Sequence, residues 1–159
     1  MPAWPSIYPY PKHIKSTSEM GTVSIPSTFA SFTETWSPRL IAAVNDHEVK
    51  VAKIDGSFVF HAHPDSDELF YLLSGELTLE IEEEQERERE TGPGSESPPV
   101  KVRAVVMQVG DVHVVPKGVR HRPVARNAQI MMIEGSGTVN TGDAEDVERR
   151  RDPIDVRKV

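Results

Sequence analysis

The sequence contains no cysteine, so neither a disulfide framework nor a thiolate metal site can form. Any metal ion must therefore be held by His, Asp or Glu side chains. The absence of cysteine also fits an intracellular protein, and we expect a cytoplasmic one. With 159 residues, the chain is long enough for a single domain whose core folds without such cross-links.

Long apolar runs are also absent. No stretch approaches the roughly 20 residues that span a bilayer. The N-terminal residues 1–11 are rich in proline and aromatic residues and lack the apolar segment of a signal peptide. We therefore expect no membrane partner.

The sequence also lacks the residues for a basic surface. The formal net charge is -7, and a nucleic-acid-binding protein needs a basic face. The cluster Arg149-Arg150-Arg151 is short and lies between Glu148 and Asp152. We interpret it as solvated surface, and we expect no nucleic-acid partner.

From residue 39 onward, short apolar runs follow one another, bounded by Gly, Pro, Asn or Asp. Many short strands separated by turn residues predict an all-β antiparallel sandwich or barrel. A helical turn is expected over Ser27–Phe32, and a weak helix over residues 143–150. The expected strands are Leu40–Val44, Val49–Ile54, Phe58–Ala62, Leu69–Leu73, Leu77–Ile81, Val102–Gln108, Val112–Val115 and Gln129–Glu134.

These patterns divide the chain into three parts. Residues 1–38 form an irregular, proline-punctuated arm that packs on the barrel or on a partner subunit through aromatic residues. Residues 39–142 form the barrel, and residues 143–159 form a C-terminal tail. Within the barrel, residues 82–100 are charged and then rich in Gly, Ser and Pro, a composition that predicts a flexible acidic loop inserted between two strands.

Chemistry is concentrated around His61 and His63. Residues two apart on a strand point to the same face, and two buried imidazoles are costly unless a cation uses their lone pairs. Glu68 follows a turn at Pro64-Asp65, so its carboxylate can reach the same point. His121 follows a predicted strand and the turn Pro116-Lys117-Gly118, which supplies a fourth ligand from a distant part of the chain.

Three imidazoles and one carboxylate suit one divalent transition metal: Fe, Mn, Ni, Co, Cu or Zn. They do not suit Ca or Mg, which prefer shells made of oxygen. Other histidines, His13, His47 and His113, are expected on the surface or rim. Methionines Met107, Met131 and Met132 lie in strand-like runs and are expected to fill the core.

Two motifs carry a family resemblance. His61-x-His63 with Glu68 and Gly75 resembles the first cupin motif, and Gly110 with Pro116-x-Gly118 and His121 resembles the second. Other segments, Asn45-Asp46-His47, Asp67–Phe70, His121–Ala125 and Asn140-Thr141-Gly142, resemble small single-domain cupins of the mannose-6-phosphate isomerase-like type. The resemblance implies a double-stranded β-helix, or jelly-roll barrel, that binds metal through His61, His63, Glu68 and His121 and forms a homodimer.

The sequence departs from the family pattern at two positions. Four residues separate Gly56 from His61 where the motif has five, and Ala125 stands where the second motif commonly ends in Asn. Neither change removes a predicted ligand.

Four protein ligands leave open positions on a five- or six-coordinate metal. The functional hypothesis is therefore a metal-dependent enzyme acting on a small organic molecule, and a dioxygenase-type oxidoreductase is favoured. The alternatives are a cupin isomerase or lyase and a non-catalytic, metal-containing, small-molecule-binding cupin, because the fold does not choose among them. Glu134 and Arg120 are candidates to assist catalysis, although the pattern alone does not place them in the pocket.

Overall fold

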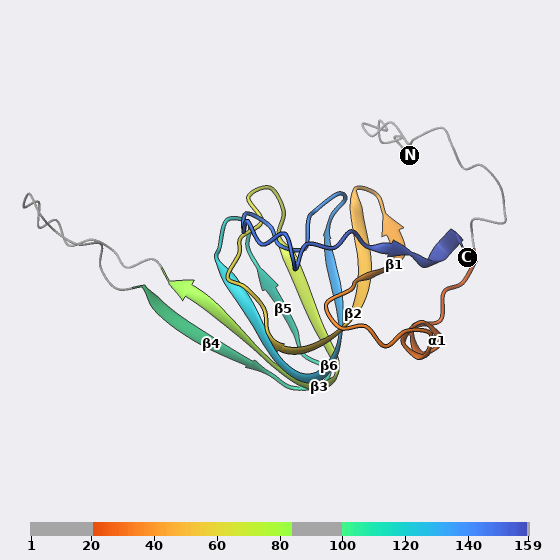
Figure 1. Cartoon of the computed structure of the whole chain (residues 1–159), viewed down its shortest axis with the longest axis horizontal. Coiled ribbons are helices and arrows are strands. Elements are labelled where there is room, and N and C mark those ends of the chain that lie inside the picture. The colour runs from red at the N-terminus through yellow and green to blue at the C-terminus, as the bar shows by residue number, and fades with distance from the viewer. Residues whose placement is uncertain (1–20, 84–99, 159) are drawn as a thin grey trace, which may run out of the picture.

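The computed structural model describes residues 21–83 and 100–158, and these residues are mostly β-strand (Figure 1). Within those two ranges there is one α-helix, and no helix is long and apolar enough to cross a membrane. The elements in chain order are α1 (Ile25–Ala30), β1 (Arg39–Val44), β2 (His47–Ser57), β3 (Glu68–Glu83), β4 (Lys101–Met107), β5 (Val112–Val115), β6 (His121–Gly135), β7 (Ile154–Asp155) and the 3₁₀ helix η2 (Val156–Lys158).

The strands form one sheet in the order β4-β3-β6-β2-β1-β7, and β5 pairs with the first part of β3. Neighbouring strands are antiparallel except β1 and β7. Strands β2, β3 and β6 curve strongly, so that the sheet closes into a cup (Figure 1). The predicted all-β barrel is therefore confirmed.

Strand β3 is longer than the sequence predicts. The two expected strands Leu69–Leu73 and Leu77–Ile81 are parts of one strand, Glu68–Glu83, so the expected break between them at residues 74–76 is wrong. Gly75 instead forms a bulge with φ 82, which glycine adopts without steric penalty. Strand β6 is likewise longer than Gln129–Glu134 and passes through Asn127 at φ 46.

The expected strand Phe58–Ala62 does not form. This segment makes one isolated bridge, between His61 and His121, and a further backbone bond from Phe58 N–H to the Pro123 carbonyl, 2.9 Å long. The segment continues beside the start of β6 after the pair Ser57 and Val124, but its backbone bonds are too widely spaced to form a continuous strand ladder. The helix expected over residues 143–150 is also wrong, because that segment consists of turns.

The helix near the N-terminus starts slightly earlier than predicted. α1 spans Ile25–Ala30, and the Ser24 side chain caps it by accepting a hydrogen bond from Ser27 N–H. Residues 1–20, 84–99 and 159 lie outside the described residues. The expectations for His13, for the aromatic residues of the first 20 positions and for most of the acidic loop therefore stay predictions. The start of that loop, Glu82-Glu83, belongs to β3.

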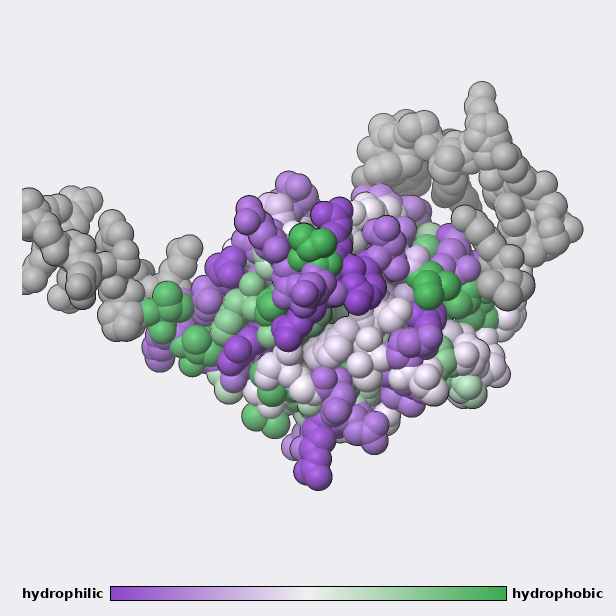
Figure 2. Space-filling view, in the orientation of Figure 1, coloured by the Kyte–Doolittle hydropathy of each residue, from purple (hydrophilic) through white to green (hydrophobic). Residues whose placement is uncertain are grey.

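Two apolar clusters fill the structure. The larger lies inside the barrel and includes Phe70, Leu79 and Ile130, and also Met107 and Met132 as predicted. The smaller joins Phe29 and Phe32 of the arm to Ile41 and Val51, with Met131 packed against it. Exposed valines of β4, Val102 and Val106 among them, lie on the β3–β4 hairpin that extends away from the cup (Figures 1 and 2).

Candidate metal centre

Four buried side chains converge at one end of the barrel. The donor atoms of His61, His63, Glu68 and His121 all lie within 4.8 Å of one another. Glu68 Oε2 is 3.0 Å from His121 Nε2 and 3.2 Å from His63 Nε2. The structure thus brings together the four residues that the sequence singled out.

The curvature of paired strands places Glu68 and His121. Glu68 begins β3 and His121 begins β6, and His121 is the register partner of Ile81, near the other end of β3. The bulge at Gly75 and the kink at Asn127 lie between these ends. The bulge and the kink bend the paired strands β3 and β6 enough to bring the end with Glu68 close to the end with His121.

The segment that carries His61 and His63 is held by backbone bonds from loops. Ala62 N–H donates to Asp143 Oδ1 at 2.7 Å, and Asp143 N–H donates to the Ala62 carbonyl at 3.0 Å. Gly118 N–H donates to the His63 carbonyl at 2.8 Å. These bonds replace the missing strand pairing and fix the two imidazoles in direction.

Asp143 and Gly142 were missed as supporting residues from the sequence. A Cβ on Gly142 would overlap the Ala62 carbonyl oxygen, so this position requires glycine. The available signal was the resemblance of Asn140-Thr141-Gly142 to small cupins, which marked the segment without giving its role.

Two histidines have their tautomers fixed by main-chain carbonyls. His61 Nδ1 lies 3.0 Å from the Val59 carbonyl oxygen, and His121 Nδ1 lies 3.0 Å from that of Val119. A carbonyl oxygen only accepts, so each Nδ1 carries the hydrogen. Each Nε2 therefore points its lone pair at the cluster, as metal-binding histidines require.

The electrostatics of the cluster favour a neutral His61 beside an anionic Glu68. Burial, with the neighbouring His121, lowers the pKa of His61 to about 4. Burial raises the pKa of Glu68, but the close imidazoles of His121 and His63 outweigh it and hold that pKa well below its usual range. For His63, burial lowers the pKa, and the close, charged Glu68 shifts it upward overall.

The buried Nε2 atom of His63 indicates whether a metal ion fits this site. His63 Nε2 has no hydrogen-bond partner in good geometry among the described residues, although Glu68 Oε2 is 3.2 Å away. A buried polar atom left in this state costs free energy. Coordination of a cation by the three Nε2 lone pairs and the carboxylate removes that cost, so the donor set fits a divalent transition metal.

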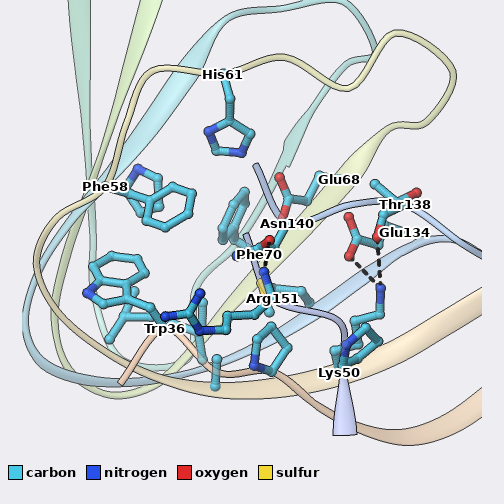
Figure 3. Close-up of a pocket in the computed structure, with 17 residues that line it drawn as sticks. Trp36, Lys50, Phe58, His61, Glu68, Phe70, Glu134, Thr138, Asn140 and Arg151 are labelled. Atoms are coloured by element: carbon cyan, nitrogen blue, oxygen red, sulfur yellow. Dashed lines mark hydrogen bonds and ion pairs between the residues drawn. The ribbon is translucent and has the colours of Figure 1, made fainter. Parts of the chain in front are cut away.

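A cavity of about 40 Å³ adjoins the cluster. It is lined by His61 and Glu68 on one side and by Lys50 and Glu134 on another, with Trp36 at its edge (Figure 3). Trp36 stacks on Phe58 at 4.8 Å between ring centroids. The open side of the donor cluster therefore faces a small, largely apolar chamber.

Lys50 and Glu134 are a buried charged pair in this chamber. Both are at most 3 % exposed, and Lys50 Nζ donates to Glu134 Oε1 at 2.9 Å. Burial and the charge of Glu68 raise the pKa of Glu134 to about 7, although Lys50 opposes them. Burial lowers the pKa of Lys50, but Glu134 and Glu48 shift it upward overall.

The other candidate residues that the sequence suggested lie in different places in the structure. Glu134 lines the cavity, whereas Arg120 lies outside it, paired with Glu82 and Asp143 and donating to the Phe60 carbonyl at 3.1 Å. His47 is exposed beside Asp46, and His113 is partly exposed on β5. Lys50 was missed, although its place in the alternation with buried Ala52 and Ile54 indicates an inward-facing side chain.

A second hollow of about 270 Å³ lies on the rim beside His63. It is lined by the loops 63–66 and 136–139 and by Gly142. Thr138 lines both this hollow and the interior cavity. The donor cluster therefore has space on two sides.

Comparison with known proteins agrees with this architecture. The profile of the cupin family matches residues 25–149. The chain belongs to the cupin family. A cupin-2 domain protein from Shewanella frigidimarina NCIMB 400 is 33% identical, with a TM-score of 0.56, over 71% of this cupin and 93% of that chain. Protein NMB1881 from Neisseria meningitidis shares the fold at 22% identity and a TM-score of 0.54, over 73% of this chain and 100% of that one.

Other matches are more distant or partial. Hydroquinone 1,2-dioxygenase PnpCD, solved with Fe3+, shares the fold at 17% identity and a TM-score of 0.55, over 80% of this cupin and 37% of that chain. The uncharacterized protein YdbB from Bacillus subtilis (strain 168) is 34% identical over 82 residues, which are 52% of this chain. The match spans 57% of the length of YdbB.

Proposed function

We propose that this cupin binds one divalent transition metal through His61, His63, Glu68 and His121 and is a metal-dependent enzyme acting on a small organic molecule. The observation that carries the proposal is the convergence of buried nitrogen lone pairs on one carboxylate, with His63 Nε2 left without a hydrogen bond among the described residues. Fe, Mn, Ni, Co, Cu and Zn all suit this donor set.

When bound, the ion supplies Lewis acidity and, for a redox-active metal, electron transfer. The residues of the chain supply the rest. Trp36, Phe58 and Phe70 line the chamber with apolar surface and limit the access of water. The carbonyls of Val59 and Val119 hold the imidazoles of His61 and His121 in the metal-binding tautomer.

A dioxygenase-type oxidoreductase is the reaction class we favour. The support is a donor set that suits redox metals, with open space beside it. The structure of a hydroquinone 1,2-dioxygenase with Fe3+ shares the fold, which indicates that the architecture is compatible with oxidative chemistry. A cavity of about 40 Å³ is smaller than an engineered cavity of about 150 Å³ that binds benzene, so the substrate we propose is smaller than an aromatic ring.

A cupin isomerase or lyase is the second candidate. Glu134 supports it, because a buried carboxylate beside the donor cluster can act as a general base that takes a proton from a bound substrate. A binding protein without turnover uses the same donor set, and the assays below separate it from both enzymes.

The first experiment is elemental analysis of protein purified without added metal. We expect about one equivalent of metal, and at least tenfold less in His61→Ala or His121→Ala. His47→Ala is the matched control, because that imidazole is exposed beside Asp46. Full metal content in the His61→Ala/His121→Ala double variant contradicts the assigned site.

The second experiment measures oxygen consumption by the Fe, Mn, Ni and Zn forms with small hydroxy acids and enols. Consumption by a redox-metal form, abolished in Glu68→Ala, supports the dioxygenase class. Substrate conversion without oxygen consumption supports the isomerase or lyase. Binding without any conversion supports the non-catalytic alternative.

A further inference from the structure

We infer that Glu134 selects the ligand of this site by accepting a hydrogen bond at Oε2 from a hydroxyl group of a metal-bound molecule. The inference rests on the proposed metal site and adds the chemical class of the ligand: small α-hydroxy acids in preference to compounds of the same shape that offer only acceptors. Glu134 touches the ligand, and Lys50 is a positioning residue.

The two oxygens of Glu134 have different surroundings. Oε1 accepts from Lys50 Nζ at 2.9 Å, whereas Oε2 is buried and has no hydrogen-bond partner among the described residues. The side chain lines the same cavity as His61 and Glu68 (Figure 3). A buried oxygen that faces a cavity without a partner is an acceptor that a ligand can use.

The neighbours of Lys50 indicate that Glu134 is not needed merely to balance a buried charge. Lys50 Nζ is 3.0 Å from Glu48 Oε2, which already provides an anionic partner, and 3.5 Å from the Thr138 carbonyl oxygen. Glu48 is not among the residues that line the cavity. The charge of Lys50 is therefore already balanced without Glu134, and Glu134 has one oxygen without a partner in a side chain that lines the chamber.

The register of the sheet sets Glu134 beside the donor cluster. Glu134 on β6 is the register partner of Glu68 on β3. A molecule that binds the ion through a carboxylate and its α-oxygen thus lies against Glu134. If that α-oxygen carries a hydrogen, it can donate to Oε2, and if it is a carbonyl oxygen, two acceptors face each other and repel.

The size of the chamber limits the ligand. A volume of about 40 Å³ is a few times the roughly 10–15 Å³ that one water requires on this measure. Three-carbon acids are near this limit. Lactate and pyruvate are a suitable pair, because they have the same skeleton and differ in whether the α-oxygen carries a hydrogen.

The test measures the affinity of the Co(II)-loaded protein for lactate, each enantiomer separately, and for pyruvate, from changes in the visible Co(II) spectrum. We expect the better enantiomer of lactate to bind about tenfold more tightly than pyruvate. Equal affinities, or binding of neither compound to the Co(II) form, overturn the inference and leave the metal site in place. Failure to load Co(II) overturns the proposed function itself.

Glu134→Gln gives a sharper readout than loss of binding. Lys50 only donates, so it holds the amide oxygen at the position of Oε1 and leaves the amide nitrogen at the position of Oε2. The group that faces the ligand changes from an acceptor to a donor. We therefore expect the preference to reverse toward pyruvate, whereas an unchanged ratio of affinities shows that Oε2 does not contact the ligand.

Two further variants guard against a folding artefact. Glu48→Gln changes the other partner of Lys50 outside the cavity and should keep the preference for lactate. Lys50→Met/Glu134→Leu replaces the whole pair by apolar side chains, an exchange that is often neutral for stability, and it should bind the two acids equally. Retained preference in this double variant contradicts the inference.

Discussion

Glu68 and His121 touch at 3.0 Å although they lie near opposite ends of the paired strands β3 and β6. His121 is the register partner of Ile81, and Ile81 is 13 positions from Glu68, which corresponds to roughly 43 Å along a straight strand. The bend at Gly75 and Asn127 removes this separation. The proposed metal centre therefore depends on a bulge that contains none of its four donor residues.

Gly75→Ala tests this dependence. A Cβ at position 75 would collide with backbone atoms of Asn127 and Ala128, which cannot move without opening the β3–β6 pair. We expect a loss of about 3 kcal/mol or more in the free energy of unfolding, measured in denaturant, together with weaker metal binding. Gly56→Ala is the matched control, because Gly56 has the same φ of 82 with nothing within 4 Å of an added Cβ. It should lose only about 1 kcal/mol, and equal losses contradict the role of the collision.

Asp143→Ala tests whether the hydrogen bonds between Asp143 and Ala62 hold His61 and His63 in place. It removes the acceptor of Ala62 N–H and one partner of Arg120, so His61 and His63 lose their fixed direction. We expect metal affinity to fall about 10-fold to 100-fold, measured by competition with a chromogenic chelator. Asp143→Asn keeps an oxygen for Ala62 N–H and should lose much less. If both variants bind metal as tightly as the native chain, the hydrogen bond from Ala62 N–H to the Asp143 side chain has no role in the site.

Trp36→Ala should widen the range of ligands. The indole lines the cavity and stacks on Phe58, so its removal enlarges the chamber that we argue is too small for an aromatic ring. Catechol should bind the Co(II) form of the variant at least tenfold more tightly than that of the native protein. Trp36→Phe retains a ring and should resemble the native protein. Tight binding of catechol by the native protein would show that the chamber opens without this change.

The stability of the metal-free protein should carry a pH dependence from His61. Its pKa in the folded chain is about 4, below the usual histidine value of 6.5, so as the pH falls the unfolded chain binds the extra proton first. The stabilising contribution is complete above pH 6.5 and is lost as the pH falls toward 4, by up to about 3 kcal/mol. Thermal unfolding with a chelator present should show the difference between the native protein and His61→Gln changing across this range. A constant difference contradicts the assigned pKa.

The homodimer stays a prediction. It rests on the family resemblance and on aromatic residues of the N-terminal arm, most of which lie outside the described residues. We expect light scattering at micromolar concentration to give twice the 17.7 kDa of the chain. A mass of one chain contradicts the prediction.

The sequence singled out the four residues that the structure brings together, because the spacing of these residues within each of the two motifs is a local property. It failed where geometry depends on residues far apart in the chain. The run Phe58–Ala62 has strand-like composition, yet its backbone partners are single groups of Asp143, His121 and Pro123. Whether Gly75 forms a turn or a bulge depends on its contact with Asn127, 52 positions away.

The placement of Lys50 is a second case in which prediction from the sequence fails because the geometry depends on distant residues. The alternation with Ala52 and Ile54 indicates its direction, but composition alone argues that a lysine faces water. Its burial depends on Glu48 and Glu134, and the register of β2 with β6 sets Glu134 within reach. That register is not readable from either strand alone.

The hairpin of β3 and β4 has a consequence for how members of this family can diverge. Glu83 pairs with Lys101 where the two strands end, and Glu68 stands at the beginning of the same long strand β3. In Figure 1 this end of the hairpin extends away from the cup. Because the donor residues lie away from this end of the hairpin, we expect a change of length between Glu83 and Lys101 to leave the donor atoms in place. We therefore expect a reporter peptide inserted there to be tolerated, and related chains that differ there to keep the same donor cluster.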